Sequence, residues 1–273
     1  VGGVAGVSAA LAEGAALSGR PRLERWARLA AAGGAAVGTV ALVHDLGTPS
    51  RFLNMLRVFK PTSPLSVGSW LLAPFGALSA ASAVSAVTGF ARPLGRLAGL
   101  GSAVLGPPLV TYTAALLCDT AVPAWHEAYR EMPFLFAGGG ASAAGGLAMM
   151  AVPVAEAAPA RRLAVLGATA DVAATELIER RLGMLGEPYQ EGRPGRLMKA
   201  ARAFTVAGAA GTLVGRRSRA VSVASGAALT VGSLLIRFGV FQAGMASAKD
   251  PKYTVAPQRE RLDRGETATV PGH

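Results

Sequence analysis

The sequence predicts an all-α protein, a polytopic bundle of about eight transmembrane helices followed by a polar tail. Hydrophobic residues make up 51% of the 273 residues, and the mean hydropathy is +0.40. Charged residues make up 16% of the chain, whereas a soluble domain carries about 25%. Apolar runs of roughly 20 residues, long enough to cross about 30 Å of hydrocarbon, recur along the chain. They are rich in Ala, Leu and Gly and lack the alternation that a membrane β-barrel needs.

Eight segments meet this test of length and apolarity. The first starts at Val1 with no basic region before it, so it does not resemble a signal peptide, and we expect a helix truncated at its start. The expected helices cover 1–18, 25–46, 66–90, 95–118, 133–155, 161–182, 197–215 and 220–246. They make a transmembrane domain over residues 1–246, and residues 247–273 form the polar C-terminal tail.

Local signals justify these elements in order. The second helix ends at Leu46-Gly47, and prolines in the following segment keep it from continuing. Pro107-Pro108 removes two amide donors from the fourth helix and should kink it. In the fifth, glycines such as Gly138 and Gly145 allow close helix packing in lipid. Tryptophans near expected helix ends are assigned to the interfacial aromatic belt: Trp26, Trp70 and Trp125.

The composition also excludes several classes of protein. Disorder needs low hydrophobicity and high charge, which this chain does not have. The net charge is +11, but the arginines lie in short clusters between apolar runs, so no nucleic-acid partner is expected. One cysteine, Cys118, excludes a disulfide framework, a zinc finger and a Cys-ligated iron–sulfur cluster within this chain.

The loops alternate in character. Short, strongly basic loops lie around 19–25, 91–96, 158–162 and 216–219, and longer loops of mixed charge lie at 47–65, 119–132 and 183–196. The positive-inside rule places the short basic loops in the cytoplasm. The longer loops and the tail are then expected outside it, in a multi-pass protein of a bacterial cytoplasmic membrane surrounded by lipid.

The most informative stretch runs from His44 to Trp70. Asp45 lies at the expected membrane border, where an unpaired carboxylate is costly, and Arg51 and Arg57 are close in sequence. We therefore expect an Asp45–Arg51 ion pair. A salt bridge that merely folds the loop is the alternative interpretation.

This stretch, DLG-x-P-x-RFLNMLRVFKPTSPLSVGSW, resembles the signature of the NrfD-like membrane subunits of polysulfide reductase and related molybdenum-enzyme complexes. Further matches are TYTAALLCDTAVPAW (111–125) and SAKDPKYTVAPQRERL (247–262), so the resemblance covers most of the chain. One position departs from the pattern, since the family usually has Arg where this chain has Thr48.

The resemblance implies a membrane subunit of an oxidoreductase complex, similar to polysulfide reductase or formate dehydrogenase, that is not catalytic alone. It implies exchange of electrons and protons with menaquinone or ubiquinone. The implied partners are a four-cluster ferredoxin-like iron–sulfur subunit and a molybdopterin catalytic subunit. The matching site residues are His44, Asp45 and Tyr112. We expect Arg51 to bind the quinone together with them, and Arg51 and Arg57 to hold the loop. A phenol or imidazole can bond a quinone carbonyl, and a carboxylate can accept a quinol proton.

Histidine usage bears on the cofactors independently of the resemblance. A dihaem anchor needs four axial ligands within its helices, usually histidines. This chain has three histidines, and His44, His126 and His273 lie at a helix end, in a loop and at the terminus. Bis-His haem is therefore excluded, no metal is expected in this chain, and electrons from a quinol would pass to a cofactor in a neighbouring subunit.

Ionisable residues inside the apolar spans are further candidates, because burying them in lipid is expensive. We hypothesise a proton route lined by Glu13, Asp171 and Glu176. The alternative is a set of inter-helix ion pairs, with Arg237 as one cation. Glu176 and Arg180 have the i,i+4 spacing of a favourable ion pair.

Two other functions stay open. Kinked helices and intramembrane acids also suit a secondary transporter or channel. The third possibility is a passive anchor that holds soluble subunits at the membrane. Binding of a quinone analogue would separate these possibilities. The tail is either a solvated end or, as the resemblance implies, a segment that lies against the iron–sulfur subunit.

Overall fold

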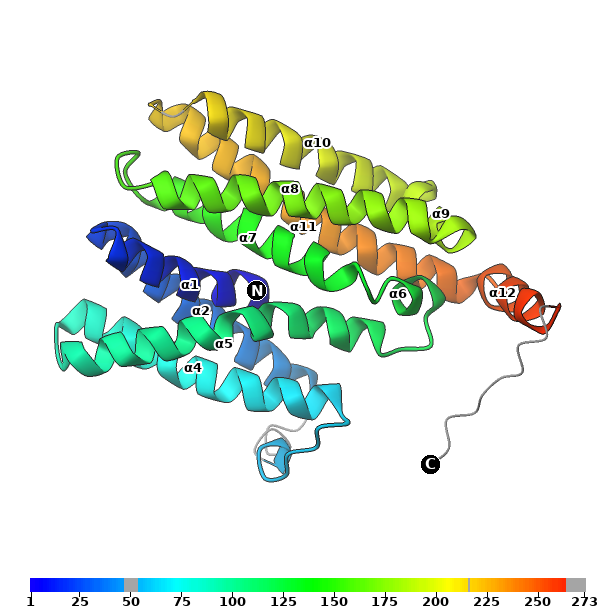
Figure 1. The fold of residues 1–273 in the computed structure, drawn as a ribbon, viewed down its shortest axis with the longest axis horizontal. Coiled ribbons are helices and arrows are strands. Elements are labelled where there is room, and N and C mark those ends of the chain that lie inside the picture. The colour runs from blue at the N-terminus through cyan, green and yellow to red at the C-terminus, as the bar shows by residue number, and fades with distance from the viewer. Residues whose placement is uncertain (47–53, 216, 264–273) are drawn as a thin grey trace.

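The computed structural model describes residues 1–46, 54–215 and 217–263, and every regular element in these ranges is a helix (Figure 1). The predicted all-α class is confirmed. The long helices are α1 Gly2–Leu17, α2 Pro21–Asp45, α4 Pro64–Thr88, α5 Arg92–Cys118, α7 Met132–Ala151, α8 Ala158–Arg181, α10 Gly192–Val214 and α11 Arg219–Lys249. The short ones are α6 Pro123–Glu127, the 3-10 turn η1 Gly183–Gly186, α9 Glu187–Gln190 and α12 Lys252–Asp263.

Five of the long helices, α2, α4, α5, α7 and α11, are long and apolar enough to cross a membrane, which indicates a multi-pass membrane protein. The other three long helices, α1, α8 and α10, lie where the sequence predicts helices, but they are not both long and apolar enough to meet this criterion. α1 has 16 residues. α8 carries charged residues along its length, among them Asp171 and Glu176, and α10 carries them in its first half, among them Lys199 and Arg202.

Helix ends follow the local chemistry of the chain. α2 and α4 begin at Pro21 and Pro64, where the missing N–H would be unpaired in any case. α4 ends at Gly89, whose φ of 73° is in the left-handed region that favours glycine. α5 runs through Pro107 and Pro108 to its end without interruption.

Close backbone contacts join the helices. A Cβ on Gly6 of α1 would lie 2.6 Å from the carbonyl oxygen of Gly106 in α5, so these two backbones touch. Gly146 of α7 meets Gly226 of α11 in the same way, with 2.6 Å from the Cβ position to the carbonyl oxygen. The glycines thus act as packing surface, as the sequence predicts.

The bundle has two groups of helices. α1, α2, α4 and α5 pack together, α7, α8, α10 and α11 pack together, and α1 and α5 contact α7 between the groups. Figure 1 shows that the long helices run in alternating directions, so their connections collect at two opposite ends. We call the end with the starts of α2, α5, α8 and α11 the basic end, and the opposite end, with α6, α9 and α12, the loop end.

Candidate functional site

A groove along the end of α2 carries two of the predicted site residues. Its volume is about 460 Å³, and the described residues of its wall are apolar apart from the last two residues of the helix. It is lined by Ala36, Val37, Val40, Ala41, His44 and Asp45. The groove therefore pairs an aliphatic wall with an imidazole and a carboxylate at the loop end of the bundle.

His44 and Asp45 form a loosely joined, accessible pair. His44 Nδ1 lies 3.9 Å from Asp45 Oδ1, and the two side chains are 89% and 83% exposed. Arg51 lies outside the described residues, so the expected Asp45–Arg51 pair lies outside them too. Arg57 is exposed, and its amide donates to the carbonyl of Asn54 at 3.2 Å.

Tyr112 occupies a different position on the same group of helices. Its ring lies against Gly68 of α4, where a Cβ would stand 1.8 Å from Tyr112 Cζ. The side chain is half-buried, and its hydroxyl makes no hydrogen bond to any residue that the structure describes. The end of α2, the start of α4 and the end of α5 meet at the loop end, so the fold brings Tyr112 to the same end as His44 and Asp45.

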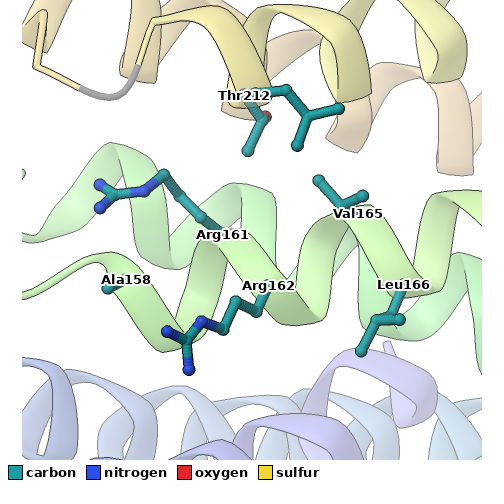
Figure 2. Close-up of a pocket in the computed structure, with 7 residues that line it drawn as sticks. Ala158, Arg161, Arg162, Val165, Leu166 and Thr212 are labelled. Carbon is teal, nitrogen blue, oxygen red and sulfur yellow. The ribbon is translucent and has the colours of Figure 1, made fainter.

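A second groove, of about 500 Å³, lies between α8 and α10 (Figure 2). Val165 and Thr212 face each other across it, while Arg161 and Arg162 extend from the first turns of α8 toward the basic end. Arg161 donates to the carbonyl of Val154 at 3.0 Å. Among the described residues, those that line this groove include no carboxylate, imidazole or phenol. This groove therefore does not show the proton-accepting groups of the α2 groove.

Glu13, the first of the three acids in the hypothesised proton route, is paired with an arginine that the sequence did not single out. Arg28 Nη2 lies 3.0 Å from Glu13 Oε1 and 3.0 Å from Glu24 Oε1. Arg28 and Glu13 form an ion pair, but the geometry between them does not make a hydrogen bond to Glu13 Oε1. Arg28 also donates to Ser82 Oγ and, at 3.2 Å, to the carbonyl of Gly95. Glu13 is thus part of an inter-helix ion pair, the alternative that the sequence left open.

Asp171 lies in the middle of α8 and is 1% exposed. Neither of its carboxylate oxygens has a hydrogen-bond partner among the described residues, and Arg237 Nη1 has none either. Both side chains face Gly139 of α7, where a Cβ would stand 3.0 Å from Arg237 Nη2 and 3.3 Å from Asp171 Oδ1. Arg237 donates to the carbonyl of Phe136 at 2.9 Å. The structure therefore holds a buried acid and a buried guanidinium close to each other without an ion pair within 4.0 Å.

Glu176, the third acid, is held by arginines. Arg202 of α10 lies 2.7 Å from its carboxylate, and Arg180 lies 3.5 Å from it, which confirms the predicted i,i+4 pair. Glu176 is five residues beyond Asp171, about 7.5 Å along the helix, whereas Glu13 belongs to the other group of helices. The fold does not bring the three acids of the hypothesised proton route into contact.

The assignment of Trp125 to the aromatic belt is wrong. Its side chain is 8% exposed, its Nε1 donates to the carbonyl of Val240 at 2.8 Å, and its ring lies against Gly244 of α11. The short helix α6 places the Trp125 side chain inside the bundle. The hydropathy of the sequence near a helix end does not reveal this burial. Trp70, by contrast, is 41% exposed and packs edge-on against Phe59.

Sequence reasoning also missed two buried polar residues. Arg28 follows Glu24 at the i,i+4 spacing, and that signal could have identified the pair. Tyr189 of α9 is fully buried, and its hydroxyl donates to the carbonyl of Ala124 at 2.9 Å. Burial raises the pKa of Tyr189, so it stays a neutral structural donor.

Within the described residues, no group of three or more His, Cys, Asp or Glu side chains comes together in a way that could hold a metal ion. Comparisons of the chain with protein-family models, curated proteins and solved structures gave no match.

Proposed function

We propose that this chain is an integral membrane subunit of a quinone-linked oxidoreductase complex in a bacterial cytoplasmic membrane, with all eight long helices crossing the bilayer. In this proposal α1, α8 and α10 cross within the bundle, where their polar residues meet partners on other helices. The ion pairs Glu13–Arg28 and Glu176–Arg202 support that placement.

The observation that carries the proposal is the groove on α2. An aliphatic wall open to the surroundings suits a lipid-soluble carrier, and the exposed His44 and Asp45 stand where its polar head would lie. A quinol bound there would supply two electrons and two protons. His44 would bond a ring oxygen, and Asp45 would accept a proton at its carboxylate.

Tyr112 supplies a second point of contact in this proposal. Its hydroxyl has no partner among the described residues and is free to donate to a ring oxygen. Gly68 leaves room for the tyrosine ring, so the phenol is positioned by the helix packing of α4 on α5. In this proposal Arg57 helps to hold the loop beyond α2, and Arg51, for which the sequence predicts the same role, lies outside the described residues.

Electrons would leave for a partner, because the sequence lacks the axial histidines of a membrane haem. We propose a four-cluster ferredoxin-like iron–sulfur subunit at the loop end and a molybdopterin catalytic subunit beyond it. Protons would use Asp171, since Glu13 and Glu176 are held in ion pairs. Proton-coupled turnover that is unchanged in Asp171→Asn vesicles would remove Asp171 from this role.

Binding of a fluorescent quinone analogue, a hydroxyquinoline N-oxide, to the purified chain in lipid nanodiscs tests the proposal. We expect saturable binding that weakens about tenfold in Asp45→Ala and Tyr112→Phe, since each loses a hydrogen bond to the head group. Asp119→Ala is the matched control, because Asp119 is an exposed acid at the same end of the bundle. Absence of saturable binding, or equal binding by all variants, would overturn the proposal.

A secondary transporter is the second candidate, and the buried pair Asp171 and Arg237 favours it. Neither the carboxylate oxygens of Asp171 nor the Nη1 of Arg237 have a hydrogen-bond partner among the described residues, and an acid beside a guanidinium in the middle of a bundle is typical of a substrate or ion site. A chain that binds no quinone analogue but accumulates a solute in vesicles, with loss in Asp171→Asn, would fit this function. A passive anchor would show neither activity.

A further inference from the structure

Four arginines surround one cavity at the basic end of the bundle. The cavity has a volume of about 400 Å³ and lies among α2, α4 and α5. Arg25, Arg28, Arg92 and Arg96 line it together with one carboxylate, Glu24. We call it the arginine pocket. It lies at the opposite end of α2 from His44 and Asp45, so it is separate from the α2 groove.

The positive charge of the arginine pocket is only partly balanced by the described residues, because its four arginines face two carboxylates, Glu13 and Glu24, and Glu13 also interacts electrostatically with Arg96. Arg28 is compensated by Glu13 and Glu24, each 3.0 Å away. Arg25, Arg92 and Arg96 form no ion pair or hydrogen bond with any residue that the structure describes. The pocket therefore keeps a net positive charge despite Glu24, and an added anion between its guanidinium groups would reduce their mutual repulsion.

Helix dipoles add to this positive potential. α2 begins at Pro21 and α5 at Arg92, so both helices point their positive N-terminal ends at the pocket. Cations in the first turns of a helix are unfavourable, and anions there are favourable. The dipole of its own helix therefore disfavours each of Arg25, Arg92 and Arg96. A bound anion would offset both this effect and the repulsion among the arginines.

The surroundings of the arginine pocket are those of a membrane interface. Phe90, Leu94 and Leu97 flank the arginines of α5 and are 78%, 67% and 65% exposed. Large apolar side chains facing outward beside arginines place this level of the bundle where acyl chains give way to headgroup phosphates. The α8–α10 groove repeats the arrangement at the same end, with Arg161 and Arg162 beyond an apolar wall (Figure 2).

We propose that the arginine pocket binds the headgroup phosphate of an anionic phospholipid, whose acyl chains lie along the apolar outer face of α5. Arg25, Arg92 and Arg96 hold the phosphate oxygens, and Arg28 stays with its carboxylates. Basic pockets between helices on one side of a membrane are suited to such lipids. This inference depends on membrane placement and not on quinone binding.

Native mass spectrometry of the purified chain with phosphatidylglycerol, phosphatidylcholine or inorganic phosphate tests the inference. We expect one tightly retained phosphatidylglycerol, whose affinity falls about fivefold in Arg92→Gln, since each basic residue contributes that much near an anionic lipid. Arg25→Gln, on the other helix, should show the same loss. Arg92→Lys, which keeps the charge, should recover part of the binding.

Arg217→Gln is the matched control, because Arg217 is exposed at the same end and does not line the arginine pocket. Equal loss in this control would show a diffuse surface charge and would overturn the inference. Equal retention of phosphatidylcholine, or displacement of the lipid by millimolar inorganic phosphate, would overturn it as well.

Discussion

Arg28 is a charged side chain that is 4% exposed where four helices meet, α1, α2, α4 and α5. It comes from α2 and contacts Glu13 of α1 and Ser82 of α4. Burying a guanidinium is costly unless its donors are used, and here two carboxylates, a hydroxyl and a carbonyl use them. One residue on α2 therefore makes side-chain contacts with α1, α4 and α5, and it helps to set the relative positions of four helices.

Replacing Arg28 by leucine should destabilise the bundle by about 3–5 kcal/mol, because the carboxylates of Glu13 and Glu24 lose their buried counter-ion. Thermal unfolding in detergent would measure the change. Arg25→Leu removes the same charge from an exposed position of the same helix and should cost little. The double variant Arg28→Leu/Glu13→Gln should recover part of the lost stability, because it no longer leaves the Glu13 carboxylate without its counter-ion. Equal stability of the two single variants would contradict this role of Arg28.

At the scale of one element, α12 shows how a polar segment docks on an apolar bundle. Tyr253 is 9% exposed, and its hydroxyl donates to Glu187 at 3.2 Å. Lys252 Nζ lies 2.6 Å from the same carboxylate, and Asp250 accepts the Lys252 amide at 2.9 Å. The hydrogen bond from Lys252 lowers the pKa of Glu187 below its usual 4.5. The first part of the tail is therefore held by a carboxylate of α9.

The docking of α12 should depend on pH. Since the pKa of Glu187 is lowered in the folded state, its contribution is complete above pH 4.5 and is lost as pH falls through the lowered pKa. A spin label at the exposed Thr254, in a Cys118→Ala background, should become more mobile on acidification below pH 4.5. Glu187→Gln should give the mobile spectrum at neutral pH as well. If neither acidification nor Glu187→Gln changes the mobility of the label, the apolar contacts of Tyr253 alone hold α12.

For the molecule as a whole, hydropathy predicts the helices and their order. Helix-length apolar runs in lipid leave few alternatives to a helix, which explains why segments such as 66–90 and 95–118 correspond to α4 and α5. The same signal does not separate eight spans from five. Whether a charged helix such as α8 crosses the bilayer depends on partners like Arg202, which lie on other helices.

The candidate site is only partly predictable for the same physical reason. His44 and Asp45 stand out because they end a helix, and all described residues that line the groove beside them belong to α2. Arg28, Trp125 and Tyr189 are fixed by long-range contacts, to Ser82, Val240 and Ala124 respectively. No local pattern in the sequence specifies those contacts.

The two ends of the bundle predict a definite membrane topology. Arg217 lies exposed at the basic end, and Lys60 lies exposed at the loop end. The positive-inside rule places the basic end in the cytoplasm, because its short connections carry the arginines. In cells that express the Cys118→Ala background, a membrane-impermeant maleimide should label Lys60→Cys directly. It should label Arg217→Cys only after the membrane has been permeabilised. Reversed labelling would invert the orientation, and labelling of both residues from the same side would contradict a membrane-spanning bundle.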